Sequence, residues 1–178
     1  MAPATALREA IPAGVGAQRP PTGWIRDGRT HMSSLYYEEF EIGQVFKTRG
    51  RTVTESDIVT FGGLSGDYSP IHMDEEFAKA SPFGGRIAHG FLGVALASGL
   101  LVQLGISEET AIALLEFGCR FTGAIRMGDT IHVRQIVKEK RETSKPERGI
   151  VTFELEVVNQ KGEVVIAGNE KIMIRRRS

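Results

Sequence analysis

Hydrophobic and polar side chains alternate along much of the last third of the chain. In the stretch VTFELEV, Val151, Phe153 and Leu155 fall on one face of a strand, while Glu154 and Glu156 fall on the other. Such alternation is typical of an antiparallel strand that buries one face. Similar β-branched segments occur within residues 111–141, 149–160 and 162–177. The pattern predicts four or five strands in this part of the chain.

A long apolar segment, residues 89–105, comes directly before these strands. Its sequence, HGFLGVALASGLLVQLG, would be apolar on nearly every side of a helix and contains several small residues. It therefore predicts a helix of about four turns that is buried all round. A central helix wrapped by a long antiparallel sheet is the hot-dog architecture, so we predict an α+β fold rather than alternating βαβ units.

Shorter elements are predicted ahead of the long helix. A turn at Gly43 precedes a strand-like stretch over residues 45–53. Thr54, followed three residues later by Asp57, forms a passable capping box and predicts the start of a helix. This helix should end near Gly66, since glycine is common just beyond a helix C-terminus.

The next segment, SGDYSPIHMDEEF, contains the first candidate chemistry. Pro70 disfavours helical backbone in the residue before it, which predicts a turn over residues 67–70. A second short helix is predicted over residues 73–80. The stretch SPFGGRIAHG, residues 81–90, is too rich in glycine for a regular element, and we predict an irregular loop there.

Residues 1–34 have a different composition from the rest of the chain. They are rich in Ala, Gly and Pro and show no sustained helical or strand period. We predict a poorly ordered N-terminal extension, either native or a tag or linker, with the folded domain over residues 35–178. The basic start and long apolar core of a secretory signal are missing from it.

Composition excludes several classes of function. Lysine plus arginine equals aspartate plus glutamate, giving a formal net charge of +0, so we expect neither nucleic acid nor an acidic membrane surface as a partner. Cys119 is the single cysteine, which rules out an internal disulfide and fits a reducing compartment. The longest apolar run, residues 91–104, is short for a membrane span. We expect a cytoplasmic protein.

Asp67 and His72 allow two interpretations. In the first, Asp67 only accepts backbone hydrogen bonds in a turn and His72 is a structural histidine. In the second, the two side chains handle a proton together, because Pro70 stiffens the backbone that connects them and the flanking helices anchor it. Histidine in general titrates near neutral pH, which suits the second role.

The start of the long helix is the other candidate feature. The first N–H groups of a helix lack partners within the helix, so they can bind a developing oxyanion. Gly90 has no Cβ and would allow an acyl carbonyl to approach, although tight packing explains it equally well. Ser98 lies further along the same helix. Its hydroxyl needs a partner, either the Val94 carbonyl or the Asp67 carboxylate.

These two segments together resemble the MaoC-like hot-dog family, which comprises R-specific enoyl-CoA hydratases and related dehydratases. The resemblance rests on SGDYSPIHMDEEFAKAS followed by RIAHGFLGVALASGL and covers residues 37–174. It implies that Asp67 and His72 activate a water, that the Gly90 N–H contacts the thioester oxygen, and that Ser98 binds the catalytic aspartate. The family usually has asparagine where this chain has Ser69, which leaves the loop geometry and substrate preference open.

The resemblance implies reversible hydration of a trans-2-enoyl-CoA to an (R)-3-hydroxyacyl-CoA. CoA is part of the substrate, so no cofactor is expected. Two alternatives remain, a hot-dog acyl-CoA thioesterase and a non-catalytic acyl-CoA binding module. The first would need an acidic residue on or near the central helix, where this chain has none.

Further contacts and assemblies are predicted less directly. Substrate contacts are assigned to Ser69, Pro70, Arg86 and His89, and Arg86 would either meet a CoA phosphate or be an ordinary surface arginine. No metal is expected, because Asp67, His72, His89 and Cys119 lack the compact spacing of a metal site. Long strands with uncovered edges predict a homodimer or larger homo-oligomer.

Overall fold

The computed structural model describes residues 25–27 and 34–177. The predicted N-terminal extension therefore lies almost wholly outside the described residues. Within it, Ile25–Asp27 forms a short strand, β1, which pairs in parallel with a strand of the folded domain. This strand was not predicted, because a segment of three residues is too short to show a hydrophobic period.

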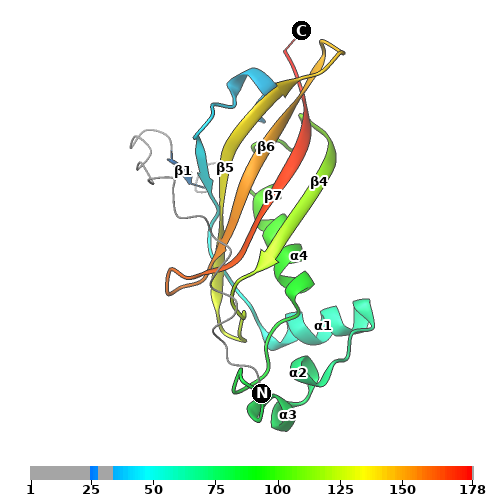
Figure 1. Cartoon of the computed structure of the whole chain (residues 1–178), viewed down its shortest axis with the longest axis vertical. Helices are drawn as coiled ribbons and strands as arrows, with labels where there is room; N and C mark the ends of the chain where they lie inside the picture. Colours follow the sequence, from blue (N-terminus) through cyan, green and yellow to red (C-terminus); the bar gives the residue numbers. More distant parts are fainter. Residues whose placement is uncertain (1–24, 28–33, 178) are drawn as a thin grey trace, which may run out of the picture.

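A single curved sheet forms most of the molecule (Figure 1). Its strand order is β1-β2-β5-β6-β7-β4, with β3 pairing separately to β5, and every pairing except β1 with β2 is antiparallel. The remaining strands are β2 (Val45–Lys47), β3 (Arg51–Thr52), β4 (Ala111–Phe121), β5 (Thr130–Glu142), β6 (Arg148–Val158) and β7 (Val164–Arg175).

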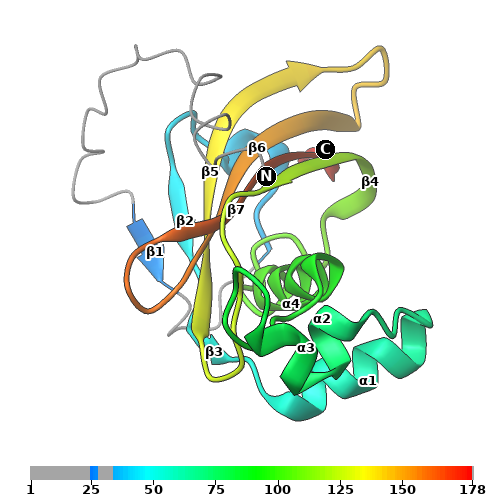
Figure 2. The ribbon, with the colours of Figure 1, turned by 60° about the horizontal axis from the view of Figure 1, so that its bottom comes forward.

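One long helix lies against the inner face of this sheet, and three shorter helices gather at one end of it (Figure 2). The long helix is α4 (Gly90–Val102), and the shorter ones are α1 (Glu55–Ser65), α2 (Pro70–Met73) and α3 (Glu75–Lys79). A single 3-10 turn, η2 (Tyr37–Glu39), precedes β2. The α+β hot-dog fold predicted from the sequence is confirmed.

The core lies between α4 and the sheet. Leu92, Leu96 and Leu100 of α4 face the inner side chains of β5 and β6, such as Val133 and Phe153, and all of these are buried. Aromatic edge-to-face contacts add to the stability of the core, where the rings of Phe153 and Phe40 meet with centroids 5.6 Å apart. The alternation predicted for β6 is present in the structure, since the side chains that point inward are buried.

The expectation that α4 is buried all round is wrong. Phe91 is 72% exposed and Val102 is 61% exposed. The Phe91 ring meets the ring of Phe121 on β4 with centroids 6.2 Å apart, and Val102, about three turns later, lies on the same side of the helix. β4 is the last strand of the sheet, and its apolar Leu114 is 60% exposed. Among the described residues no element covers this side, so apolar side chains that suggested burial remain in contact with solvent.

The connecting elements were predicted with less accuracy. The stretch over residues 45–53 is two short strands, β2 and β3, separated by a break. The short helix expected over residues 73–80 is present as α3, which is capped by the Asp74 side chain, and a further short helix, α2, begins at Pro70, where only a turn was predicted. No helix in the described part of the chain is long and apolar enough to cross a membrane.

Candidate active site

Asp67 lies in the loop between α1 and α2, at a place fixed by both helix ends. Thr54 caps the start of α1 through the predicted capping box with Asp57, and Gly66 ends the helix with a left-handed φ of 75°. The Asp67 Oδ1 accepts hydrogen bonds from the Ser69 hydroxyl at 2.7 Å and from the Ser69 backbone N–H at 3.1 Å. These hydrogen bonds lower the pKa of the Asp67 carboxyl, and nearby histidine charge acts in the same direction.

His72 projects from α2, whose first residue, Pro70, fixes the start of the helix. Its Nδ1 lies 2.8 Å from the backbone carbonyl oxygen of Ile87. A carbonyl oxygen can only accept, so Nδ1 must carry the proton in this contact. In the neutral ring Nε2 is then unprotonated, and it can accept a proton from a bound molecule.

His89 connects the loop to α4. It is the residue immediately before the helix, is only 2% exposed, and its Nε2 donates to the Asp67 backbone carbonyl at 2.9 Å. Its ring stacks on His72 with centroids 3.9 Å apart. These contacts hold Asp67 and His72 in place, while the substrate contact predicted for His89 stays a prediction. The His89 Nδ1 has no hydrogen-bond partner among the described residues.

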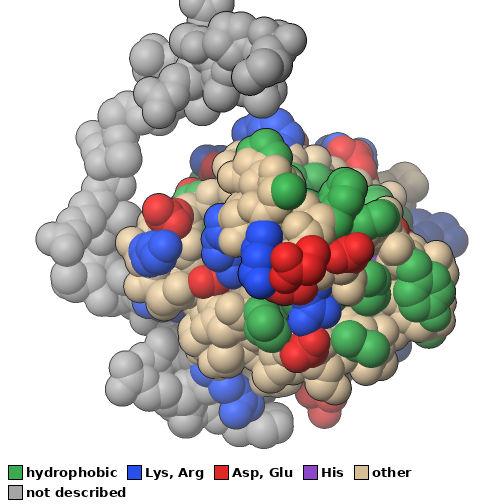
Figure 3. All heavy atoms as spheres, turned by 90° about the horizontal axis from the view of Figure 1, so that it is seen from below, with side chains coloured by type: hydrophobic (Ala, Val, Ile, Leu, Met, Phe, Trp, Pro, Cys, Tyr) green, Lys and Arg blue, Asp and Glu red, His purple; other side chains and the backbone are tan. Residues whose placement is uncertain are grey.

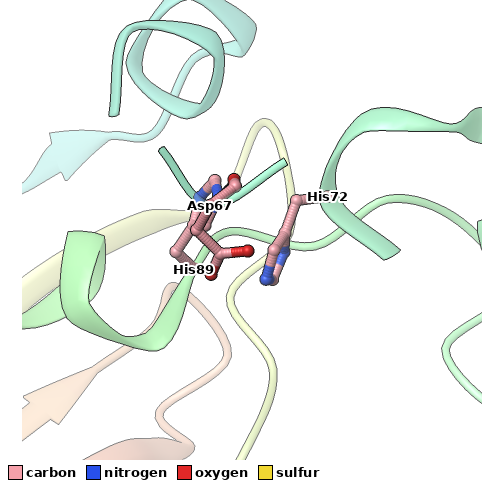
Figure 4. Close-up of side chains that lie close together, drawn as sticks. All are labelled: Asp67, His72 and His89. Carbon is pink, nitrogen blue, oxygen red and sulfur yellow. The ribbon is translucent and has the colours of Figure 1, made fainter. Parts of the chain in front are cut away.

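The three side chains meet at one point, with the Asp67 carboxylate directed toward the His72 ring (Figure 4). One oxygen or nitrogen from each of Asp67, His72 and His89 lies within 4.8 Å of the others. Within the described part of the chain, no hydrogen bond joins the Asp67 carboxylate directly to the His72 ring. A gap of this size matches one water that bridges two groups at ordinary hydrogen-bond lengths.

The same three residues are the group that could hold a metal ion. The sequence spacing did not indicate this group, because His89 lies 22 positions after Asp67 and only the fold brings the two together. Cys119, the fourth residue considered, is on β4 and lines a different cavity. The His72 Nδ1 and the His89 Nε2 already bind backbone carbonyls. The other nitrogen of each ring and a carboxylate oxygen of Asp67 are left to bind either a water or an ion.

A hollow of about 560 Å³ opens beside this cluster. Its wall includes His72, His89, Gly90, Phe121 and Ile166. The cluster therefore faces the N-terminus of α4, as the sequence interpretation requires.

Gly90 has a clear packing role at this point. A Cβ on Gly90 would lie 2.8 Å from the ring of Phe121, too close for any other residue without movement of that ring. Gly90 is also the first residue of a helix of 13 residues, so its N–H lies among those without an intrahelical acceptor. Packing and anion binding are therefore compatible uses of the same glycine.

Neither partner considered for the Ser98 hydroxyl is engaged. Ser98 is exposed two turns into α4, and among the described residues its hydroxyl binds neither the Val94 carbonyl nor Asp67, which Ser69 binds instead. Arg86 forms ion pairs with Glu55 of α1 and with Glu75 of α3 at 3.3 Å. Its charge is thus already matched, and its evident role is to tie these helices together.

The end of the molecule that carries α1 to α3 displays charged side chains of both signs (Figure 3). Basic and acidic side chains intermingle in the middle of this face, while apolar side chains gather toward one side. This mixture gives no support to a nucleic-acid surface, in agreement with the neutral net charge.

A second cavity, of about 250 Å³, lies between α4 and the sheet. Its walls are almost entirely apolar, and they include Ser98 and Leu101 from α4 together with Ile166 from β7. Ile166 also lines the hollow beside the histidines, so the two spaces adjoin at this side chain. A narrow apolar space next to a polar cluster is a common form of binding site for a small molecule.

Comparisons with known proteins agree with this architecture. The family model described as "MaoC like domain" matches residues 38–159. An (R)-specific enoyl-CoA hydratase of Rhodospirillum rubrum is 33% identical over 142 residues, which cover 80% of this chain and 93% of the hydratase. Protein MaoC of Klebsiella aerogenes is 38% identical over 128 residues, but these cover 72% of this chain and only 38% of that protein.

Solved structures give the same result. A protein of Archaeoglobus described as a monoamine oxidase regulatory protein superimposes with a TM-score of 0.77 at 36% identity, covering 83% of this chain and 99% of that one. The MaoC-like dehydratase from Rhodospirillum rubrum gives a TM-score of 0.73 at 31% identity, with 82% and 99% covered. By fold, family match and sequence identity, the chain belongs to the MaoC-like family.

Proposed function

We propose that the protein reversibly hydrates trans-2-enoyl-CoA thioesters to (R)-3-hydroxyacyl-CoA. The observation that carries the proposal is the paired placement of the Asp67 carboxylate and the His72 ring, one water apart, beside the start of α4. The names of the similar (R)-specific enoyl-CoA hydratase and MaoC-like dehydratase, both of Rhodospirillum rubrum, support the same reaction class. The reaction needs no cofactor, because CoA enters as part of the substrate.

His72 is the base in this mechanism. Its Nδ1 proton is fixed on the Ile87 carbonyl, so Nε2 accepts a proton from the water as the water oxygen attacks the β-carbon. Asp67 is a poorer base because hydrogen bonds from Ser69 lower the pKa of its carboxyl. It accepts a hydrogen bond from the other O–H of the water, which stays intact and becomes the product hydroxyl, and so orients the water. The proton taken by His72 is then delivered to the α-carbon, which completes the addition of water.

Negative charge moves onto the thioester oxygen between these two steps. The free N–H groups at the start of α4, with Gly90 first among them, are placed to receive it. They are fixed by the helix and need no reorganisation when the charge develops. Ser69 keeps the carboxylate oriented, in the place where the family usually has a longer asparagine.

Crotonyl-CoA tests this function against its alternatives. The proposal predicts loss of the enoyl absorbance and formation of (R)-3-hydroxybutyryl-CoA, with no free thiol. Release of free thiol would identify a thioesterase instead. Saturable binding with neither change would identify a non-catalytic acyl-CoA binding module.

We also assign a second copy of the chain to the apolar edge formed by β4 and the adjoining side of α4. An edge strand offers a row of backbone hydrogen-bonding groups, and two β4 strands can pair antiparallel about a two-fold axis. Exposed Leu115 of β4 and Val102 of α4 would be covered by the same contact.

The cytoplasm stays the predicted location of the protein.

Sedimentation velocity at micromolar concentration measures this assembly. The wild-type chain is expected to sediment as a dimer or larger oligomer, and Val102→Glu to shift it toward the monomer because a charge would be buried at the interface. Ile42→Glu, at an exposed apolar position away from this edge, is the matched control. A wild-type monomer would contradict the assignment.

A further inference from the structure

The apolar cavity under α4 has a polar end. Most of its lining is aliphatic or aromatic, but the carboxyl-bearing Glu170 of β7 also lines it. Glu170 is only 7% exposed and lies on the inner face of the sheet, as Ile166 does. A carboxyl group in such surroundings is unusual, because acidic side chains are rarely buried without a charged partner.

Glu170 has one hydrogen-bond partner in the described part of the chain. The Gln135 side chain of β5, itself 3% exposed, donates from Nε2 to Glu170 Oε1 at 2.8 Å. The other end of the amide, Gln135 Oε1, is buried with no partner among the described residues. Turning the amide over exchanges its two ends and still leaves one without a partner.

This pair is unfavourable for the fold on its own. A buried polar atom without a partner destabilises the folded state, because it has lost its hydrogen bonds to water and gained none. Burial raises the pKa of the Glu170 carboxyl, with the Gln135 hydrogen bond acting in the opposite direction, so the carboxyl holds a proton more readily than an exposed glutamate does. A neutral carboxylic acid can both donate and accept a hydrogen bond, and its second oxygen is free to meet a group in the cavity.

The position of the pair relates it to the proposed reaction. Ile166 borders both the catalytic hollow and this cavity, and Glu170 follows it by four residues on β7. Four residues of a strand span about 13 Å. An acyl chain whose thioester lies beside His72 would therefore pass Ile166, run between α4 and the sheet, and end near Glu170.

We infer that the cavity selects acyl chains that end in an uncharged hydrogen-bonding group, a hydroxyl in the simplest case, which binds Glu170. This inference rests on the proposed function and adds a substrate class to it. A terminal hydroxyl matches a carboxylic acid because each group donates and accepts. A terminal methyl leaves Glu170 without a second partner, and a terminal carboxylate would bury a negative charge beside an acid.

Competition between chain ends tests the inference. Hydration is measured with 2-enoyl-CoA thioesters of increasing chain length, each made with a methyl, a hydroxyl and a carboxylate end. At the length that reaches Glu170, kcat/KM for the hydroxyl-ended chain is expected to exceed that of the methyl-ended chain by about tenfold. The carboxylate-ended chain is expected to be the poorest of the three.

Variants locate the effect. Glu170→Leu combined with Gln135→Leu is expected to reverse the preference in favour of the methyl-ended chain, whereas Glu170→Gln keeps a hydrogen-bonding end and should retain it. Glu154→Leu, which removes an acid from the outer face of β6, is the matched control and should leave the preference unchanged. If the double variant does not fold, the wild type and Glu170→Gln still decide the outcome.

The same thioesters in saturated form separate this inference from the proposed function. They cannot be hydrated, so their binding by calorimetry reports the cavity alone. Tighter binding of the hydroxyl-ended thioester supports the inference even if crotonyl-CoA is not turned over. Equal or weaker binding of the hydroxyl-ended thioester, or a preference that the double variant retains, would overturn it even in an active hydratase.

Discussion

Two carboxyl groups of this protein, Asp67 and Glu170, lie in opposite surroundings. Asp67 is exposed in a loop, and hydrogen bonds from Ser69 lower the pKa of its carboxyl. Glu170 is buried on the inner face of the sheet, and burial raises the pKa of its carboxyl. The first is therefore suited to hold a water as an anion, and the second to meet a neutral polar group as an acid.

The comparison also separates two ways of positioning a polar group. Asp67 is held by local hydrogen bonds and by His89, which joins the loop to α4. Glu170 is held by a regular strand and by one contact across the sheet to Gln135. Changes at Asp67 should therefore act on the rate, while changes at Glu170 should act on substrate choice and on stability.

The largest effect is expected from removing either member of the catalytic pair. Asp67→Asn or His72→Ala should lower the hydration rate by about 10²–10⁴-fold, because proton transfer by a positioned side chain contributes that much. Circular dichroism and thermal melting should match the wild type, since the fold core does not include these side chains. A near-normal rate in either variant would refute the catalytic assignment.

A smaller effect is expected from the residue that orients Asp67. Ser69→Ala removes the hydroxyl hydrogen bond, so the pKa of Asp67 should rise and the rate should fall by roughly tenfold. An NMR titration of the Asp67 carboxyl checks the cause. Its pKa should be higher in Ser69→Ala than in the wild type. Ser69→Asn supplies a polar side chain again and should recover part of the rate, whereas an unchanged Asp67 pKa in Ser69→Ala would contradict the role of Ser69.

The smallest effect concerns the stability of the folded chain. Because the pKa of Glu170 is raised in the folded state, that state binds its proton more tightly than the unfolded chain does, and stability falls as pH rises above the unfolded value of 4.5. Glu170→Gln cannot ionise. As pH increases, its free energy of unfolding should therefore rise relative to that of the wild type, by about 1.4 kcal/mol for each pH unit between the unfolded and folded pKa values of Glu170. Chemical denaturation at several pH values measures this difference, and a constant offset across pH would contradict it.

Much of the fold could be predicted from periodicity. The strands after residue 110, the capping box of α1 and the helix α4 all follow from local patterns that burial enforces. The exposure of Phe91 and Val102 could not be predicted, because an apolar side chain looks the same in sequence whether the chain itself or a second copy covers it.

The site was predicted in part. Asp67 and His72 lie close in the sequence and are flanked by helices, so their meeting followed from local structure. The contacts of His89 with the loop, and of Gln135 with Glu170, join residues 22 and 35 positions apart. Only the folded chain brings these residues together, and neither pair forms a motif of recognisable spacing.

The most direct test of the central claim compares the wild type with a double variant, Asp67→Asn with His72→Ala, on crotonyl-CoA. The enoyl absorbance is followed in both under the same conditions. The account predicts that the wild type removes the absorbance, giving the (R)-3-hydroxy product, and that the double variant leaves it in place while remaining folded. Equal loss of absorbance in both proteins, or no loss with the wild type, would contradict it.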